Sequence, residues 1–306
     1  MLNFKKNVWI VIPTWNRCQD LLACLCSLKQ VHYSPFHILV VDNASEDGSA
    51  DAVEEYFPNV KLFRLPQNIG ASQASNIGFR YALANDADFV ARLDSDTVVS
   101  STFLTPLVKL AVGNPMIGIV SPKIYYFEPS NLIWYAGVDA HAFHFGTIHN
   151  LQDKKDSPKA NEYRQVDYAC GAAMLIRREV LEKTKGFDPD FFIYYEEVDF
   201  CKRIQDLGYQ IYYLATSEIW HKVGSSANTP WTAYHWNRSK MLFYRKHARG
   251  TAHFLSLVAY AFAYALADAA LKSLRIREKS GNRGPLKDAL RGLWDGFHEP
   301  RSDQKG

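Results

Sequence analysis

Two aspartates, Asp94 and Asp96, follow directly after the apolar run Phe89–Leu93. Residues two positions apart in an extended chain point to the same side, so both carboxylates reach the same edge of a sheet. Two anions held this close repel each other unless a cation lies beside them. The usual cation is a hard divalent ion with oxygen ligands, and such an ion commonly binds a diphosphate. The alternative is a solvated strand end, where acidic doublets are common without any ligand.

A second acidic pair, Glu196 and Glu197, follows the aromatic segment Phe191–Tyr195. Aromatic neighbours indicate a partly buried setting, which raises the pKa of a carboxyl group. A carboxylate in such a setting can act as a general base that takes a proton from an attacking hydroxyl. The alternative is a solvated helix N-terminus, where acidic side chains are favourable because of the helix dipole.

An alternation of strand-like and helix-like segments must position these residues. Apolar, β-branched runs predict buried parallel strands, and the segments between them predict helices. The expected strands are 8–12, 37–41, 61–65 and 89–93, and the expected helices are 21–28, 45–56 and 71–84. This rhythm predicts an α/β fold with a Rossmann-like, mostly parallel central sheet flanked by helices. Ligands of such sheets lie off the carboxyl ends of the strands, where Thr14, Asp42 and Asp94 fall.

Composition excludes several classes of protein. The chain has 306 residues, of which 47% are hydrophobic and 22% are charged, as in a globular protein with a substantial core. A net charge of +3 is too small to indicate a nucleic-acid partner. The five cysteines lack zinc-finger spacing, which predicts free thiols in a reduced, cytoplasmic setting. We expect no signal peptide, because the apolar run 8–12 is short and leads into Pro13.

The glycine-rich motifs of the common nucleotide-binding folds are missing from the sequence. Neither G-x-G-x-x-G after the first strand nor G-x-x-x-x-G-K-[ST] occurs, so a nicotinamide dehydrogenase and a P-loop NTPase lose their main support. The one relevant turn is Asn68-Ile69-Gly70-Ala71, which leads into the helix expected over 71–84. Two interpretations stay open: Gly70 shapes the helix entry, or backbone donors and the positive helix end face a phosphate.

Several motifs occur in the order found in a known family. They are Val11–Arg17, Val40–Ser49, Asn68–Ala71, Asp94–Asp96, Cys170–Arg178, Gly186–Asp188 and Phe191–Arg203. Together they resemble family 2 glycosyltransferases of the GT-A fold, and the block from Cys170 onward is similar to the rhamnosyltransferase-like branch. The resemblance implies an enzyme that moves a sugar from a nucleoside-diphosphate sugar to a hydroxyl group with the help of a divalent ion.

The resemblance implies nucleotide-binding roles for residues at the strand ends. Asp42 would accept a hydrogen bond from the base or the ribose, and an Asx-turn is its alternative or additional role. Thr14 and Arg17 would contact the base and a phosphate. Asn68 and Gly70 would lie beside the phosphates.

The resemblance also implies a metal site and a catalytic base. Asp94 would touch the ribose or reach the ion through water, and Asp96 would bind Mg²⁺ or Mn²⁺ directly. His221 matches a histidine that often completes this metal site, although an isolated histidine among aromatic residues is more often a core residue. Glu197 would be the base, with Glu196 positioning or tuning it. The family usually has Glu-Asp at this pair, so the base here has an arm one methylene longer.

The last part of the chain has a different character. We expect residues 1–250 to form the catalytic domain and residues 251–306 to form a C-terminal helical extension. Phe254–Leu271 is apolar but marginal for a membrane span, and Asp268 near its end weighs against one. The residues that follow are rich in lysine and arginine, which predicts peripheral contact with an anionic membrane. Homodimerisation, or packing on the catalytic domain, is the alternative.

The residues and the resemblance together predict an inverting, metal-dependent glycosyltransferase in the cytoplasm, peripheral on the inner face of the cytoplasmic membrane. It would move a sugar, with L-rhamnose as the candidate, from a dTDP- or UDP-linked donor to a polysaccharide or a lipid-linked glycan. A sugar-phosphate nucleotidyltransferase is an alternative, although its glycine-rich, basic N-terminal loop is missing. The second alternative is a noncatalytic nucleotide- or glycan-binding scaffold with the same fold.

Overall fold

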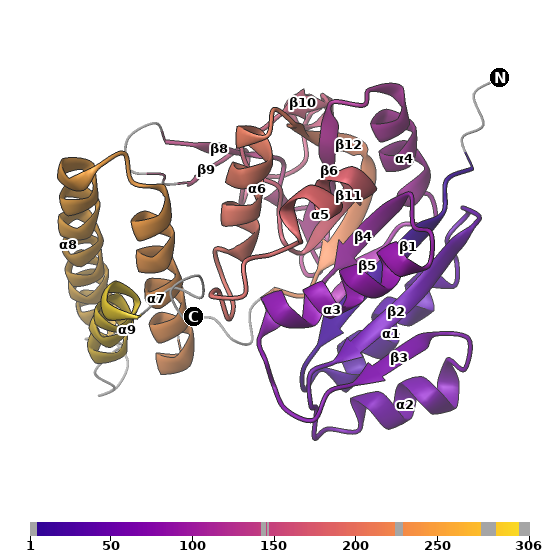
Figure 1. Ribbon diagram of the computed structural model, residues 1–306, viewed down its shortest axis with the longest axis horizontal. Helices are drawn as coiled ribbons and strands as arrows, with labels where there is room; N and C mark the ends of the chain where they lie inside the picture. Colours follow the sequence, from indigo (N-terminus) through magenta and orange to yellow (C-terminus); the bar gives the residue numbers. More distant parts are fainter. Residues whose placement is uncertain (1–4, 142–144, 146, 224–228, 277–285, 300–306) are drawn as a thin grey trace. The chain divides into compact units, whose positions relative to one another are not determined.

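The structure, a computed structural model, describes residues 5–141, 145, 147–223, 229–276 and 286–299 (Figure 1). The chain divides into two compact units. Unit 1 comprises residues 1–187 and 200–223, and unit 2 comprises residues 188–199 and 224–306. The expected domains 1–250 and 251–306 stay a prediction.

A parallel block of four strands forms one half of the sheet in unit 1. These strands lie in the order β3-β2-β1-β4. Their bounds are β1 Val8–Thr14, β2 Phe36–Asp42, β3 Lys61–Arg64 and β4 Phe89–Leu93. All seven residues of β1 are buried, so both of its faces are covered, as expected for a central parallel strand. The register pairs Thr14 with Asp42, so the carboxyl ends of β1 and β2 lie side by side.

Helices flank the sheet of unit 1 (Figure 1). They are α1 Cys18–Leu28, α2 Ser49–Tyr56, α3 Ala71–Ala84, α4 Leu104–Gly113 and α5 Arg178–Thr184. The helix expected over 45–56 begins only at Ser49, because the preceding residue Gly48 has a φ of 80°. Asp47 instead accepts hydrogen bonds from the Ser49 backbone and hydroxyl. Helix α3 packs closely on β1, since a Cβ atom at Gly78 would lie 2.2 Å from Val11.

The other half of the sheet is mixed. It contains β6 Ile117–Tyr126, β11 Ala173–Arg177, β12 Gln210–His221, β10 Arg164–Gln165, β5 Thr97–Val99 and β7 Ile133–Tyr135. Strand β11 lies antiparallel between β4 and β6, and β12 is parallel to β6. The short strand β5 pairs antiparallel with the end of β12. Strands β8 Val138–Ala140 and β9 Thr147–His149 form a separate ribbon, and a 3₁₀ turn spans Pro158–Asn161. This sheet matches the predicted α/β architecture.

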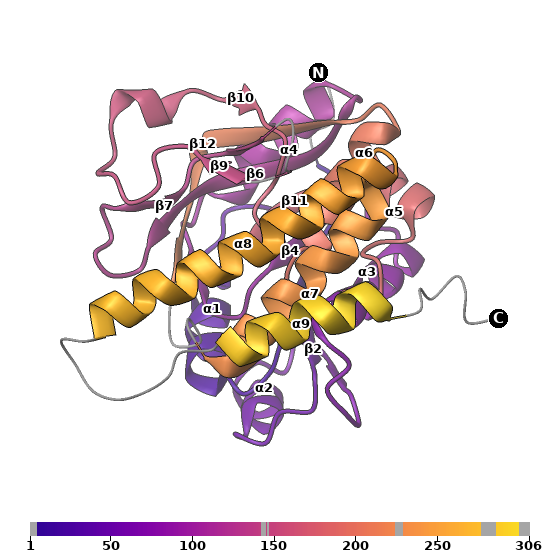
Figure 2. The same ribbon diagram turned by 90° about the vertical axis from the view of Figure 1, so that its left-hand side faces the viewer.

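Unit 2 consists mainly of three helices, shown in orange to yellow in Figure 2: α7 Pro230–His247, α8 Thr251–Ile276 and α9 Leu286–His298. Helices α7 and α9 approach each other closely at two glycines of α9. A Cβ atom at Gly292 would lie 2.2 Å from the Tyr234 carbonyl oxygen, and one at Gly296 would lie 2.5 Å from that of Arg238. Helix α6, Glu196–Asp206, begins in unit 2 and ends in unit 1.

No described helix is both long and apolar enough to span a membrane. Most of the basic stretch that predicted contact with anionic lipid, including residues 277–285, lies outside the described residues. The predicted helical extension after residue 250 is present as α8 and α9.

Candidate functional site

Two aspartates and one histidine come together at the edge where β4 and β12 end. Asp94 and Asp96 follow β4, and His221 is the last residue of β12. The antiparallel pairing of β5 with β12 sets His221 opposite Thr97, next to Asp96. One potential ligand atom from each of the three side chains lies within 4.8 Å of the other two. The structure therefore brings Asp96 and His221, the metal ligands implied by the resemblance, together with Asp94, which was expected to touch the ribose or to reach the ion through water.

The potential ligand atoms of this cluster lie close enough together for one divalent ion to approach all three side chains. His221 Nε2 lies 3.0 Å from Asp96 Oδ1 and 3.9 Å from Asp94 Oδ2. Carboxylate oxygens suit Mg²⁺ and Mn²⁺, and imidazole nitrogen is better matched to a transition metal. The donor set therefore fits a divalent ion such as Mg²⁺ or Mn²⁺.

A buried arginine keeps the first aspartate charged. Arg92, on β4, lies 2.7 Å from Asp94 Oδ1 and also donates to the Gly171 carbonyl oxygen. Burial acts to raise the pKa of Asp94, but the charge of Arg92, with His221 next in size, outweighs it and lowers this pKa. Asp94 is therefore an anion at neutral pH.

The imidazole of His221 responds to the two aspartates. Burial acts to lower the pKa of His221, but the hydrogen bond to Asp96 and the charges of Asp96 and Asp94 raise it overall. A metal ligand must give up this proton, so metal binding at His221 releases a proton. Residues 224–228, which follow shortly after His221, are outside the described residues.

A second set of polar groups lies at the carboxyl ends of β1 and β2. Thr14 and Asp42 are both about 3% exposed, and their atoms Oγ1 and Oδ1 have no hydrogen-bond partner. The other oxygen of Asp42, Oδ2, accepts a hydrogen bond from the Ser45 backbone, so the predicted Asx-turn is present. Unsatisfied buried polar atoms cost free energy. Two such atoms on neighbouring strand ends are the pattern expected of a site that is completed by a polar ligand.

The turn before α3 is held by side chains rather than left open. Asn68 Oδ1 accepts from Gly70 N at 2.9 Å and from Asn43 Nδ2 at 2.8 Å, and Asn43 Oδ1 accepts from Ile69 N. Gly70 has φ 86° and ψ 162°, a conformation that only glycine adopts readily. Gly70 therefore shapes the helix entry. Its backbone donor is used within the turn, and a role of this turn at phosphate stays a prediction.

The charge of Arg92, then that of His221 and, to a smaller extent, that of Arg17 lower the pKa of Asp94. Arg17 Nη1 lies 3.3 Å from Asp20, which also pairs with Lys222 Nζ at 3.0 Å. The cationic side chains of Arg17 and Lys222 thus both pair with the Asp20 carboxylate.

The second acidic pair begins α6 and belongs to unit 2. The segment that carries it is fixed by α7. Asp199, fully buried, lies 2.8 Å from both Lys246 Nζ and His247 Nε2, and Lys246 also contacts Asp188. Ser239 donates to the Ile193 carbonyl oxygen. Glu196 and Glu197 therefore stand on a backbone held at both ends, and their catalytic roles stay predictions.

Sequence reasoning missed two residues of the metal cluster's surroundings. Arg92 is a charged residue inside an otherwise apolar strand, two positions before Asp94, and this pattern was the available signal. Trp134 packs edge-on against His221 with ring centroids 4.5 Å apart. Nothing in the local sequence connects these two rings, which are 87 positions apart.

Comparison with known proteins identifies the family of this chain. Residues 9–185 match the model of the glycosyl transferase family 2. An N-acetylglucosaminyl-diphospho-decaprenol L-rhamnosyltransferase of Mycobacterium tuberculosis is 26% identical over 241 residues, which is 72% of this chain and 78% of that protein. The dTDP-rhamnosyl transferase RfbF of Shigella flexneri is 22% identical over 258 residues, covering 79% of this chain and 81% of the relative.

Solved structures share the fold at low sequence identity. GalNAc-T7, crystallised with UDP, GalNAc and Mn²⁺, aligns with 98% of this chain and 59% of its own, with a TM-score of 0.68 and 16% identity. A mannosyltransferase of Pyrobaculum calidifontis, in complex with GDP-Man and Mn²⁺, aligns with 97% of this chain and 88% of its own, with a TM-score of 0.59 and 16% identity. The predicted family and fold are confirmed. The chain belongs to glycosyl transferase family 2 and is a glycosyltransferase with the GT-A fold.

Proposed function

We propose that the protein is a metal-dependent, inverting rhamnosyltransferase that takes L-rhamnose from dTDP-rhamnose and adds it to a lipid-linked glycan. The similarity to two rhamnosyltransferases, one of them named for a diphospho-decaprenol acceptor, supports this choice of sugar and acceptor. A UDP-linked donor is the alternative, because the buried groups at Thr14 and Asp42 could serve either pyrimidine base.

The observation that supports the proposal most is that two groups of polar side chains lie at the same edge of the sheet. The orphaned oxygens of Thr14 and Asp42 and the cluster of Asp94, Asp96 and His221 all lie at the ends of strands within unit 1. The first pair suits a nucleoside, which presents hydrogen-bond donors and acceptors. The cluster would hold Mg²⁺ or Mn²⁺, which, when bound, offsets the charge of the diphosphate and stabilises it as it leaves.

The transfer would be a single displacement at the anomeric carbon. The acceptor hydroxyl oxygen forms a bond to this carbon while the bond from the carbon to the diphosphate breaks. Glu197 takes the hydroxyl proton, and the nucleoside diphosphate departs with the electron pair. Glu196, its neighbour, positions Glu197, and the first turn of α6 places three acidic groups, Glu196, Glu197 and Asp199, near the positive helix end.

The C-terminal helices would bring the enzyme to its acceptor at the inner, cytoplasmic face of the membrane. Leu255, Tyr264 and Leu266 on α8 and Trp294 on α9 are each more than half exposed. Exposed apolar and aromatic side chains followed by a basic sequence suit an interfacial contact with anionic lipid. A homodimer would also cover these side chains, and co-sedimentation with anionic vesicles together with the mass in solution distinguishes the two.

The test is a transfer assay with purified protein, Mn²⁺ and a synthetic N-acetylglucosaminyl-diphospho-lipid acceptor. Donors are dTDP-rhamnose, UDP-glucose, UDP-N-acetylglucosamine and GDP-mannose, and the product is identified by mass spectrometry and by the anomeric configuration of its new linkage. The proposal expects rhamnose transfer with inversion, abolished by Asp96→Asn. Transfer from a UDP- or GDP-sugar alone would overturn the donor assignment. No transfer from any donor, with nucleotide still bound, would favour a binding scaffold.

A further inference from the structure

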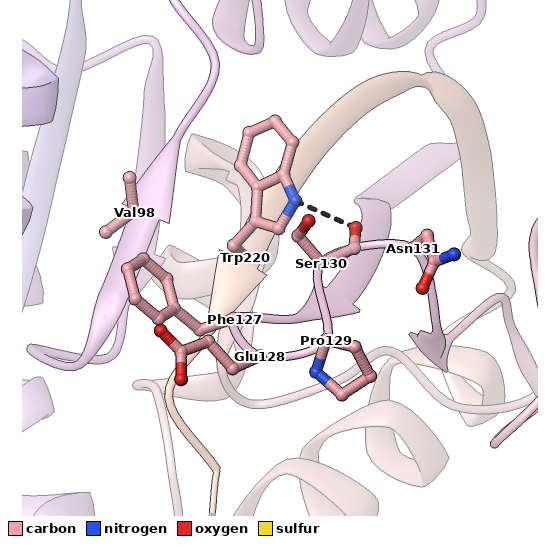
Figure 3. A pocket seen from close by; sticks show the side chains of 7 residues that line it. All are labelled: Val98, Phe127, Glu128, Pro129, Ser130, Asn131 and Trp220. Atoms are coloured by element: carbon pink, nitrogen blue, oxygen red, sulfur yellow. Dashed lines mark hydrogen bonds between the residues drawn. The ribbon is translucent and has the colours of Figure 1, made fainter.

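A pocket separate from the metal cluster opens in unit 1 beside the loop between β6 and β7. Its volume is about 560 Å³, and Val98, Phe127, Glu128, Pro129, Ser130, Asn131 and Trp220 line it (Figure 3). Most of these residues belong to the loop, and the other two come from β5 and β12. None of them is part of the nucleotide or metal arrangement described above.

The pocket lies on the face of β12 opposite the metal cluster. Trp220 and His221 are neighbours in this strand, so their side chains point to opposite faces. Trp220 pairs in register with Val98, and His221 pairs with Thr97. A ligand in the pocket therefore does not compete with a nucleotide at the cluster, although both sites share the same strand pair.

The aromatic wall of the pocket is held in place. Trp220 Nε1 donates to the Ser130 carbonyl oxygen at 3.3 Å (Figure 3). The indole also stacks on Tyr125, with ring centroids 5.9 Å apart at 21°. Tyr125 is in turn fixed by hydrogen bonds from its hydroxyl to Asp156 and Glu218. The ring of Phe127, 37% exposed, lies on the neighbouring part of the wall. Fixed aromatic rings cost little entropy when a ligand packs on them.

The polar groups of the pocket are those that bind hydroxyls. Glu128 offers a carboxylate, Asn131 an amide and Ser130 a hydroxyl, and all three residues are exposed. None of the seven lining residues is a lysine, an arginine or a histidine, and Lys222, whose Nζ lies 5.0 Å from the centroid of the Phe127 ring, is already paired with Asp20. A pyranose matches this lining, because its C–H face packs on an aromatic ring while its equatorial hydroxyls bond to carboxylate and amide groups.

We propose that this pocket binds a neutral sugar residue of the acceptor glycan, at a position outside the reacting hydroxyl. The proposal rests on the proposed function for the identity of the acceptor, whereas binding of a neutral pyranoside to the pocket does not require transfer. A second contact on the far face of β12 would let the enzyme favour acceptors that carry more than one sugar.

The first test measures binding of methyl α-L-rhamnopyranoside and methyl N-acetyl-β-D-glucosaminide to the full chain by ¹⁵N-edited NMR. The proposal expects at least one glycoside to bind in the millimolar range and to shift the backbone signals of residues 127–131. Glu128→Ala and Asn131→Ala should each weaken this binding about 3- to 10-fold, as the loss of one hydrogen bond would. Glu55→Ala, at an exposed glutamate of α2, is the matched control and should leave it unchanged.

Binding of dTDP with Mn²⁺ is measured on the same variants to separate this inference from the proposed function. The proposal expects that binding to match the wild-type protein, because the pocket and the cluster lie on opposite faces of β12. No glycoside-induced shift in the loop, or shifts that persist unchanged in both pocket variants, would overturn the inference even if transfer is observed. Glycoside binding at the loop in a protein that transfers no sugar would uphold it while the proposed function fails.

Discussion

The substitution Asp96→Asn tests metal ligation by the cluster with little change of side-chain shape. The amide has the shape of the carboxylate and can still hydrogen-bond to His221, whose Nε2 lies 3.0 Å from Asp96 Oδ1 in the structure. The charge and the preferred oxygen ligand are lost. Changing groups that merely orient metal ligands costs about 10- to 100-fold in affinity, so losing a ligand should cost at least about 100-fold.

This change in affinity predicts a thermal shift. Mn²⁺ at 100 times its Kd stabilises the wild-type protein by about 2.7 kcal/mol, and at the same concentration the variant would gain only about 0.4 kcal/mol. At about 2–4 °C per kcal/mol for a unit of this size, the melting temperature of the wild type should rise by about 5–11 °C and that of the variant by about 1 °C. Differential scanning calorimetry with and without Mn²⁺ measures both.

The matched control is Asp20→Asn, which removes an equal charge from the neighbouring pair with Lys222 without touching the cluster. We expect this control to keep the wild-type response to Mn²⁺. Equal thermal responses of the wild-type protein and Asp96→Asn would refute the ligand role. Loss of the response in both variants would show that the ion is attracted by general negative charge rather than ligated.

Three further outcomes are expected. Glu197→Gln should lower kcat in the transfer assay by about 10²- to 10⁴-fold and leave dTDP binding unchanged, because it removes the general base. An activity near that of the wild type would exclude Glu197 as the base. Lys246→Met should lower the free energy of unfolding in urea by about 3 kcal/mol, because the buried Asp199 loses its lysine partner at 2.8 Å. A decrease of less than about 0.5 kcal/mol would contradict a stabilising role of this ion pair. Burial, with a smaller effect from Arg238, lowers the pKa of His235 to about 4 from its ordinary 6.5, so the unfolded chain takes up a proton that the folded chain refuses. The free energy of unfolding should therefore fall by about 1–2 kcal/mol as the pH drops from about 6.5 to 4, a value that allows for partial exposure of the ring to solvent. A His235→Phe variant whose free energy of unfolding falls by the same amount over this pH range would disprove the cause.

The local pattern of the sequence was enough to predict the first half of unit 1. The strand over 89–93 and the helix over 71–84 have the predicted bounds, because apolar periodicity and the flanking turn residues act within a few positions. The start of α2 was placed too early, since Ser45 and Asp47 are used in turns before Gly48 rather than in a helix cap.

Contacts between distant residues could not be predicted in the same way. The position of His221 beside Asp96 depends on β5 pairing with β12, across 125 positions, and only the family resemblance suggested it. The contact of Lys246 with Asp199 likewise joins two helices through a buried charge pair that neither helix's own sequence reveals. Such pairs are selected by the packing of the whole unit, which a single sequence does not encode locally.

The central claim is that the cluster of Asp94, Asp96 and His221 binds a metal ion that the nucleotide requires. Isothermal titration of the purified protein with dTDP, UDP and GDP, each with and without Mn²⁺, tests it most directly. The account predicts that dTDP binds more tightly than GDP and that this binding is lost when Mn²⁺ is withheld. Equal binding of dTDP in the presence and absence of Mn²⁺, or no binding of any nucleotide by the folded protein with Mn²⁺ present, would contradict it.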